Sequence, residues 1–141
     1  MSIQAILLPL FVQIALTLGL LLCLAELRRR DVASGAVRPS KIGLSEPDWS
    51  PRAKQVSYAF SNQFELPVLF YVLTILVIIT RKGDLLFVIM AWIFVVMRIL
   101  QAWIYITSNN VRYRFMYYLV GAIVLIVMWA VFMVRILTGA P

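Results

Sequence analysis

Apolar residues in this chain gather into four long stretches that are separated by short polar segments. The stretches cover residues 3–27, 66–80, 85–107 and 115–137. A helix needs about 20 apolar residues to cross the hydrocarbon core of a bilayer. The pattern therefore predicts an all-α integral membrane protein, a single domain over residues 1–141 whose four transmembrane helices form one bundle.

The second apolar stretch is too short to cross alone, and an amphipathic segment extends it toward the N-terminus. Pro51 suits the first turn of a helix, so we expect one helix over residues 52–80. Such a helix is about 43 Å long and protrudes from the bilayer on the side of the preceding loop. Pro67 removes one backbone donor, so we expect a kink near this residue.

Basic residues flank the apolar stretches unequally, and this asymmetry predicts the topology. Residues 28–51 contain three prolines, two glycines and mixed charge, a composition typical of a surface loop. Nine lysines and arginines lie near the span ends on the side of this loop, and three lie on the opposite side. Because cytoplasmic segments carry the excess of positive charge, we expect a multi-pass protein with loop 28–51 in the cytoplasm and both termini away from it.

Composition narrows the possible chemistry further. Apolar residues make up 63% of the chain and charged residues 13%, which excludes a disordered chain and agrees with a lipid environment. The net charge of +7 is spread around the spans, which favours anionic lipid or acidic ligands over nucleic acid. The chain has no histidine and one cysteine, Cys23, so we expect no metal site.

A few strongly polar side chains remain at membrane depth, where charge is expensive. The most conspicuous are Glu65 in the second span and Arg98 in the third. An ionisable residue inside a span is a functional-site hypothesis by default. Glu65 lies about 17 residues before the turn near Lys82 and Arg98 about 16 after it, a mismatch of roughly 2 to 3 Å in depth. We therefore predict that the two form an ion pair or share one hydrogen-bonded network.

Helical spacing places further polar residues beside these two. Residues three, four or seven apart share a face of a helix. The two polar stripes consist of Tyr58, Asn62 and Glu65 in the second span and of Arg98, Gln101 and Tyr105 in the third. If the stripes face each other, they form a ligand-binding site; the alternative is that they only join the helices.

These residues resemble a known family. The run from Asn62 to Pro67 resembles the Asn-x-x-Glu then Pro signature of the second helix in the MAPEG family, the membrane-associated proteins in eicosanoid and glutathione metabolism. Arg98, Tyr105 and Arg114 are similar to the Arg, Tyr, Arg series of its microsomal glutathione transferases. The resemblance covers nearly the whole chain and suggests a bacterial-type member.

The resemblance implies a homotrimer that binds its ligand between adjacent subunits, open to the cytoplasmic side. It implies glutathione as co-substrate, with membrane lipid and a lipophilic small molecule as the other partners. Carried over to this chain, Asn62 and Glu65 hold the ligand's polar backbone, and Arg98 and Tyr105 line the pocket. Arg114 is then the candidate catalytic residue, because a cationic group beside a thiol favours the nucleophilic thiolate.

The chain also departs from the family pattern. Tyr58 stands four residues before Asn62, where glutathione-using members usually have an arginine, and Ile99 replaces a tyrosine that often follows the third-span arginine. Arg52 or Lys54 lies one to two turns farther out and offers a replacement cation.

Three functions stay open at this point. The first is a glutathione-dependent transferase or peroxidase that acts on lipophilic electrophiles. The alternative is a non-catalytic lipid-binding or scaffold member of the same fold. A small proton-coupled drug exporter fits less well, because such transporters keep a carboxylate in the middle of the first helix, and here that helix has only Glu26 near its cytoplasmic end.

Overall fold

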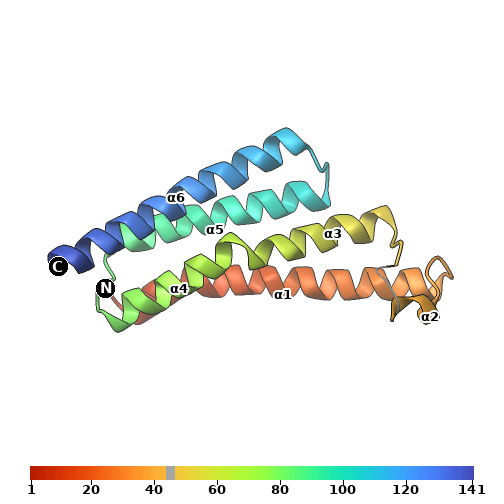
Figure 1. Ribbon diagram of the computed structural model, residues 1–141, viewed down its shortest axis with the longest axis horizontal. Coiled ribbons are helices and arrows are strands. Elements are labelled where there is room, and N and C mark those ends of the chain that lie inside the picture. The colour runs from red at the N-terminus through yellow and green to blue at the C-terminus, as the bar shows by residue number, and fades with distance from the viewer. Residues whose placement is uncertain (44–46) are drawn as a thin grey trace.

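The computed structural model describes residues 1–43 and 47–141, apart from the side chain of Lys41, and within this part every regular element is a helix. The elements are α1 (Ile3–Ala33), α2 (Pro39–Ile42), α3 (Pro51–Ser61), the 3-10 turn η1 (Asn62–Phe64), α4 (Leu66–Ile79), α5 (Leu85–Ile106) and α6 (Val111–Thr138). The long helices run along one axis, with both chain ends at one end of the bundle and α2 at the other (Figure 1).

Four segments are long and apolar enough to cross a membrane, which confirms the predicted integral membrane fold. They are α1, the combined segment Pro51–Ile79, α5 and α6. Many large apolar side chains are exposed on the outer faces of these helices, as expected where lipid replaces water. An even number of spans places both termini on the same side of the membrane; which side they face stays a prediction.

Each span begins at a polar residue whose side chain accepts a backbone N–H of the first turn. Ser2 accepts from Ala5, Ser50 from Ala53, Asp84 from Phe87, and Asn110 from Arg112 and Tyr113. Because a cap satisfies a donor that has no partner within the helix, it fixes where the helix begins. The Asn110 cap explains why α6 begins at Val111, whereas we predicted a start near residue 115.

The first helix continues past the predicted end at residue 27. Glu26 accepts hydrogen bonds from Arg29 Nη2 at 2.8 Å and from Arg30 Nε at 3.0 Å, so ion pairs along the helix support its polar extension to Ala33. The predicted loop 28–51 is correspondingly shorter. It is also anchored to the helix ends, since the Ser50 N–H donates to Asp31 Oδ2 at 3.0 Å and Trp49 is buried.

The second span is broken, as Pro67 predicted. Between α3 and α4 the chain tightens into η1, and Glu65 has φ −96° and ψ −103°, outside helical values. In an unbroken α-helix the Gln63 carbonyl would accept the N–H of residue 67, which proline lacks. The 3-10 geometry instead pairs the Glu65 N–H with the Asn62 carbonyl at 3.3 Å.

The largest core cluster lies toward the end of the bundle that carries the chain termini. It joins buried side chains of α1, α4, α5 and α6: Ile6, Phe70, Leu73, Val77, Phe87, Ala91, Phe94, Val95, Leu125 and Met128. Phe70 of α4 and Phe94 of α5 stack with ring centroids 5.0 Å apart. Polar side-chain contacts lie at the break and at both ends of the bundle.

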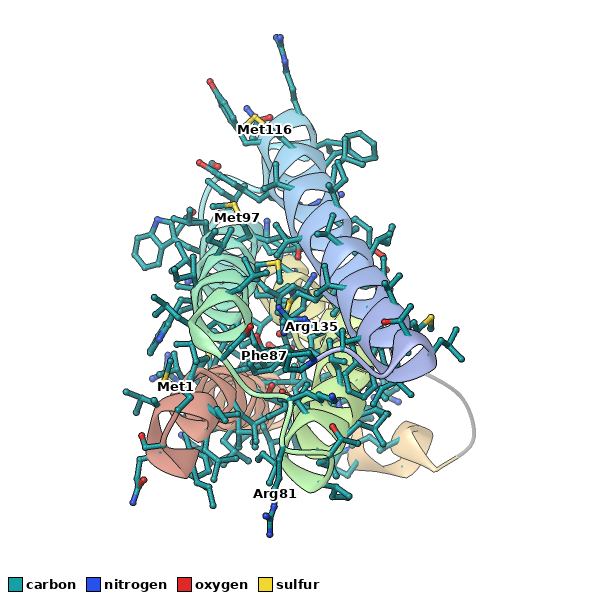
Figure 2. The ribbon with its side chains drawn as sticks, turned by 90° about the vertical axis from the view of Figure 1, so that its left-hand side faces the viewer. Met1, Arg81, Phe87, Met97, Met116 and Arg135 are labelled. Carbon is teal, nitrogen blue, oxygen red and sulfur yellow. The ribbon has the colours of Figure 1, made fainter. Side chains whose placement is uncertain are left out.

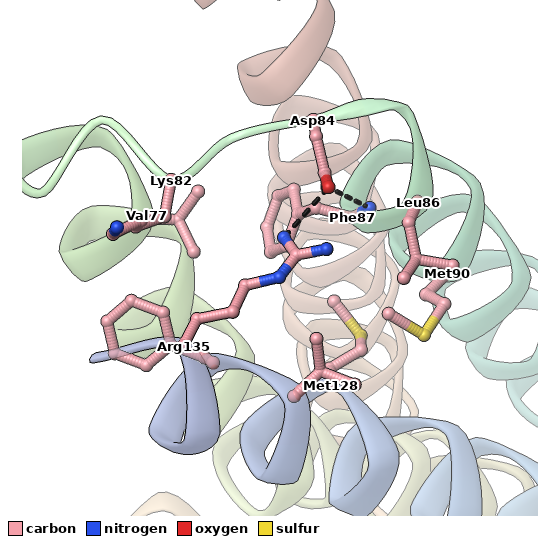
Figure 3. A pocket seen from close by; sticks show the side chains of 10 residues that line it. Val77, Lys82, Asp84, Leu86, Phe87, Met90, Met128 and Arg135 are labelled. Carbon is pink, nitrogen blue, oxygen red and sulfur yellow. Dashed lines mark hydrogen bonds and ion pairs between the residues drawn. The ribbon is translucent and has the colours of Figure 1, made fainter. Parts of the chain in front are cut away.

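A polar clamp closes the bundle at the end that carries the termini. Asp84 begins α5 by accepting the Phe87 N–H with Oδ1 at 3.0 Å, and its Oδ2 lies 2.8 Å from Arg135 Nη1 of α6 (Figure 3). Arg135 points toward the bundle interior, whereas Arg81 extends away from it (Figure 2). Lys82 Nζ donates a hydrogen bond to the Ala140 carbonyl and so links the turn before α5 to the C-terminus.

This clamp predicts a graded loss of stability. Asp84→Asn keeps an oxygen for the helix cap but loses the charge, so we expect a cost of about 0.5 kcal/mol. Asp84→Ala also loses the cap, which adds about 1 kcal/mol. Thermal unfolding of the detergent-solubilised protein measures both variants. Equal melting temperatures for the two variants would show that the cap contributes nothing.

Candidate functional site

Four of the predicted site residues line one hollow beside the break. Asn62, Gln101, Tyr105 and Arg114 form its polar part, and the remaining lining residues are Val111, Phe115 and Tyr118. The hollow is open and has a volume of about 240 Å³. It lies where the last turns of α5 meet the first turns of α6, so three separate segments of the sequence contribute to it.

Arg114 lies in the first turn of α6 and is the most accessible cation of this hollow. Its guanidinium carbon is 4.1 Å from the centre of the Tyr105 ring, within the range of a cation–π contact. Its Nη1 also donates to Asn109 Oδ1. Asn109 has φ +52°, a left-handed conformation that asparagine tolerates better than most residues. The turn before α6 therefore holds the guanidinium over the Tyr105 ring at the edge of the hollow.

Arg98 lies deeper and is fully buried. Its Nη2 donates to the Asn62 carbonyl at 2.9 Å, and its guanidinium carbon lies 5.9 Å from the centre of the Tyr118 ring. Nε and Nη1 of Arg98 are buried without a hydrogen-bond partner, as is Oε1 of Gln101 one turn later. Unpaired buried polar atoms cost stability, so this cluster is not optimised for the subunit alone.

The predicted ion pair between Glu65 and Arg98 is not formed. Among the ion pairs of the described residues none involves either side chain, and Glu65 is exposed whereas Arg98 is buried. The alternative prediction was one shared hydrogen-bonded network, and the two residues do share an acceptor: the Asn62 carbonyl accepts from Arg98 Nη2 and from the Glu65 N–H. The depth estimate assumed a regular helix, and the 3-10 turn changes the direction in which Glu65 leaves the backbone.

The predicted stripe of the second span is divided between two surfaces. Asn62 faces the hollow with Gln101, while Tyr58 is 61% exposed and lines a second hollow. That second hollow has a volume of about 440 Å³ and is lined by Arg28, Pro47, Trp49, Lys54, Ser57, Tyr58 and Ser61. The structure therefore brings Asn62 together with Gln101 and Tyr105 of the third-span stripe and places Tyr58 on another surface.

Two cations, Arg28 and Lys54, line the second hollow with Tyr58, and the sequence analysis named Lys54 but not Arg28. Arg28 Nη2 lies 3.5 Å from Ser57 Oγ, and its guanidinium carbon is 5.0 Å from the centre of the Trp49 ring. Lys54 Nζ lies 2.6 Å from Asp48 Oδ1 and lowers the pKa of that carboxyl. Lys54, Tyr58 and Ser61 are four and three residues apart, and this spacing could have indicated that they share one helix face.

The other replacement cation that we considered does not reach this hollow. Arg52 donates through Nη1 to the carbonyl of Ile106, at the end of α5. Arg52 therefore links the start of the second span to the end of the third. Lys54, one turn before Tyr58, is the candidate that the structure places beside it.

Comparison with known proteins identifies the family of the chain through a family profile. No curated protein and no solved structure matches the chain significantly. The sequence profile of the MAPEG family matches residues 6–134, which covers all four spans nearly from end to end. The match therefore includes both hollows and the break between them, and the chain belongs to the MAPEG family.

Proposed function

We propose that this protein is a glutathione-dependent transferase or peroxidase that acts on lipophilic electrophiles. The observation that carries the proposal is the position of Arg114, whose guanidinium lies over Tyr105 in a hollow shared with Asn62 and Gln101. Family membership supports the same class of chemistry. Lipophilic substrates partition into the bilayer and reach the hollow from the membrane, while glutathione arrives from the aqueous side.

Arg114 has a direct role in this chemistry. A free thiol has a pKa of about 8.5, so most of it is protonated at neutral pH. A guanidinium beside the sulfur favours the thiolate, and the released proton passes to water. The thiolate then attacks the electrophilic carbon and the leaving group departs with the bonding electron pair. In a peroxidase reaction, two glutathione molecules reduce one hydroperoxide to an alcohol and water and form the disulfide.

The charges of glutathione suggest a role for the second hollow. The tripeptide carries two carboxylates and one ammonium group at neutral pH. Arg28 and Lys54 lie around Tyr58 and offer the positive charge that position 58 itself lacks. The exposed carboxylate of Glu65 is a partner for the ammonium group. This arrangement supports glutathione binding despite the missing arginine.

The two hollows are built from different helices, and this supports a site between subunits. One hollow is formed by α5, α6 and Asn62, and the other by α1, α3 and the loop before α3. Neither contains both the candidate thiolate stabiliser and the cations around Tyr58. We therefore infer that one glutathione bridges the two kinds of hollow on adjacent copies, in the homotrimer that the family resemblance implies.

A non-catalytic lipid-binding or scaffold protein is the second candidate. The observation that favours it is the hydrogen bond from Arg114 to Asn109, which already occupies part of the guanidinium. In this case the hollow binds an amphiphile and no thiolate forms. Glu26 gives the transporter hypothesis no support, because its carboxylate is bonded to Arg29 and Arg30 near the end of α1.

The first prediction concerns glutathione itself. At 100 times its dissociation constant a ligand adds about 2.7 kcal/mol of stability, so we expect a clear rise in melting temperature of the solubilised protein. Arg114→Met should lower conjugation of 1-chloro-2,4-dinitrobenzene by about a hundredfold while glutathione still binds. Arg112→Met, which removes an exposed arginine of the same turn that does not line the hollow, serves as the matched control. Stabilisation by glutathione without any conjugation would favour the non-catalytic candidate.

The second prediction tests the cations around Tyr58. Lys54→Gln should weaken glutathione binding about fivefold, as expected for a partly exposed ion pair. The same substitution should have little effect on binding of a glutathione ester in which the carboxylate that would face Lys54 is esterified and therefore uncharged. Arg52→Gln removes a nearby charge that faces α5 and is the control. Isothermal titration of both ligands separates these cases, and equal losses for the two ligands would contradict the assignment.

The third prediction asks whether Arg98 serves stability or ligand binding. A buried charge that lacks part of its hydrogen bonds contributes little to stability, and its replacement by an apolar side chain of similar size is often neutral. We expect the free energy of unfolding of Arg98→Met to lie within about 1 kcal/mol of the parent value. Glutathione should no longer raise the melting temperature of this variant. A loss of about 3 kcal/mol or more would instead identify Arg98 as a structural link between the helices.

A further inference from the structure

Two buried amides connect α1 with the break in the second span. Gln13 Nε2 donates to Gln63 Oε1 at 2.7 Å, and Gln63 Nε2 donates to the Ala59 carbonyl at 2.9 Å. The exposed fractions of the two residues are 0% and 1%. Polar groups at membrane depth are expensive unless they are bonded, so these amides constrain each other strongly. Neither residue lines the two hollows.

Gln63 is the middle residue of η1, and the residues beside it belong to the candidate site. Asn62 lines the hollow and offers its carbonyl to Arg98. Phe64 is 58% exposed and Glu65 is exposed. The contact between Gln63 and α1 therefore decides which side of the break faces the bundle and which faces outward.

The geometry of the break determines where the site residues point. A 3-10 turn advances by about 120° per residue and an α-helix by about 100°. If the three residues of η1 relaxed into an α-helix, Glu65 would rotate by about 60° relative to α3. Pro67 prevents an unbroken series of helical hydrogen bonds but does not determine whether the three residues of η1 are 3-10 or α-helical. We infer that the hydrogen bond from Gln13 to Gln63 determines which geometry forms.

We propose that Gln13 is a positioning residue for the ligand site. It holds Gln63 against α1 and so sets the rotation of Asn62 and Glu65 toward bound glutathione. The inference rests on the proposed function, since glutathione is the ligand that these residues would bind. Gln13 itself touches no ligand and acts through Gln63.

The test uses the double variant Gln13→Leu/Gln63→Leu. Replacing both partners of a buried hydrogen bond by apolar residues of similar size is close to neutral for stability. The melting temperature should therefore stay near that of the parent, while the Kd and KM for glutathione rise about tenfold because Asn62 and Glu65 lose their orientation. The value of kcat with 1-chloro-2,4-dinitrobenzene at saturating glutathione should change little. Backbone amides at residues 65 and 66 should exchange hydrogen faster.

Thr17→Val is the matched control. Thr17 lies one turn after Gln13 on α1, and its hydroxyl donates to the Gln13 carbonyl within the same helix. This variant removes a polar group near the amides without touching the contact with Gln63. It should bind glutathione and exchange hydrogen at residues 65 and 66 like the parent protein.

A folded double variant with unchanged Kd and unchanged exchange would overturn the inference. If the double variant does not fold, Gln13→Asn decides the question, because its amide is one methylene too short to reach Gln63 and stays polar. If the parent protein itself does not bind glutathione, the proposed function fails. Hydrogen exchange at residues 65 and 66 then decides the inference alone, and unchanged exchange overturns it.

Discussion

A backbone carbonyl inside the second span, that of Asn62, is the point on which the arrangement of the site depends. A carbonyl oxygen has two lone pairs, and a regular helix uses one of them for an N–H four residues later. In the 3-10 turn the Asn62 carbonyl instead accepts the N–H of Glu65, three residues later, and it also accepts a hydrogen bond from Nη2 of Arg98. A single atom thus fixes the tight turn of the second span and the position of a buried cation from the third.

The membrane makes this constraint stronger than it would be in water. In hydrocarbon a freed carbonyl or amide has no solvent to pair with, so each must find a partner within the protein. Arg98 supplies one partner from α5, and Gln13 bonds Gln63 from α1. The break is therefore held from two opposite helices. The core between α1, α4, α5 and α6 is apolar and packs through Phe70, Phe94 and their neighbours.

The sequence predicted the architecture well because membrane thickness and hydrophobicity act over whole segments. Four spans, the early start at Pro51 and the break near Pro67 follow from length and residue type alone. The direction of Glu65 did not follow, because the 3-10 turn rotates the side chains that come after it and the sequence estimate assumed a regular helix. The separation of Tyr58 from Asn62 did not follow either, because different segments of the chain lie beside each of them. The hollow around Tyr58 was missed because Arg28 and Trp49 come from segments distant in the sequence. Asn109 and Asn110, which orient Arg114 and begin α6, are local signals that a closer search for caps would have found.

Unpaired polar atoms near the first hollow support the proposal of a binding site over that of a structural link between helices. Where polar residues only join helices, few of their polar atoms should stay unpaired; the chain from Gln13 through Gln63 to Ala59 leaves one buried atom, Gln13 Oε1, without a partner. Around the first hollow more atoms stay unpaired, because Arg98 retains two buried nitrogens and Gln101 one oxygen without partners. Two donors and an acceptor at the same level match the needs of a ligand that itself carries carboxylates and amides. Three of the unpaired buried atoms lie near the open hollow that Arg114 lines, and this is the arrangement expected of a site that binds a polar ligand.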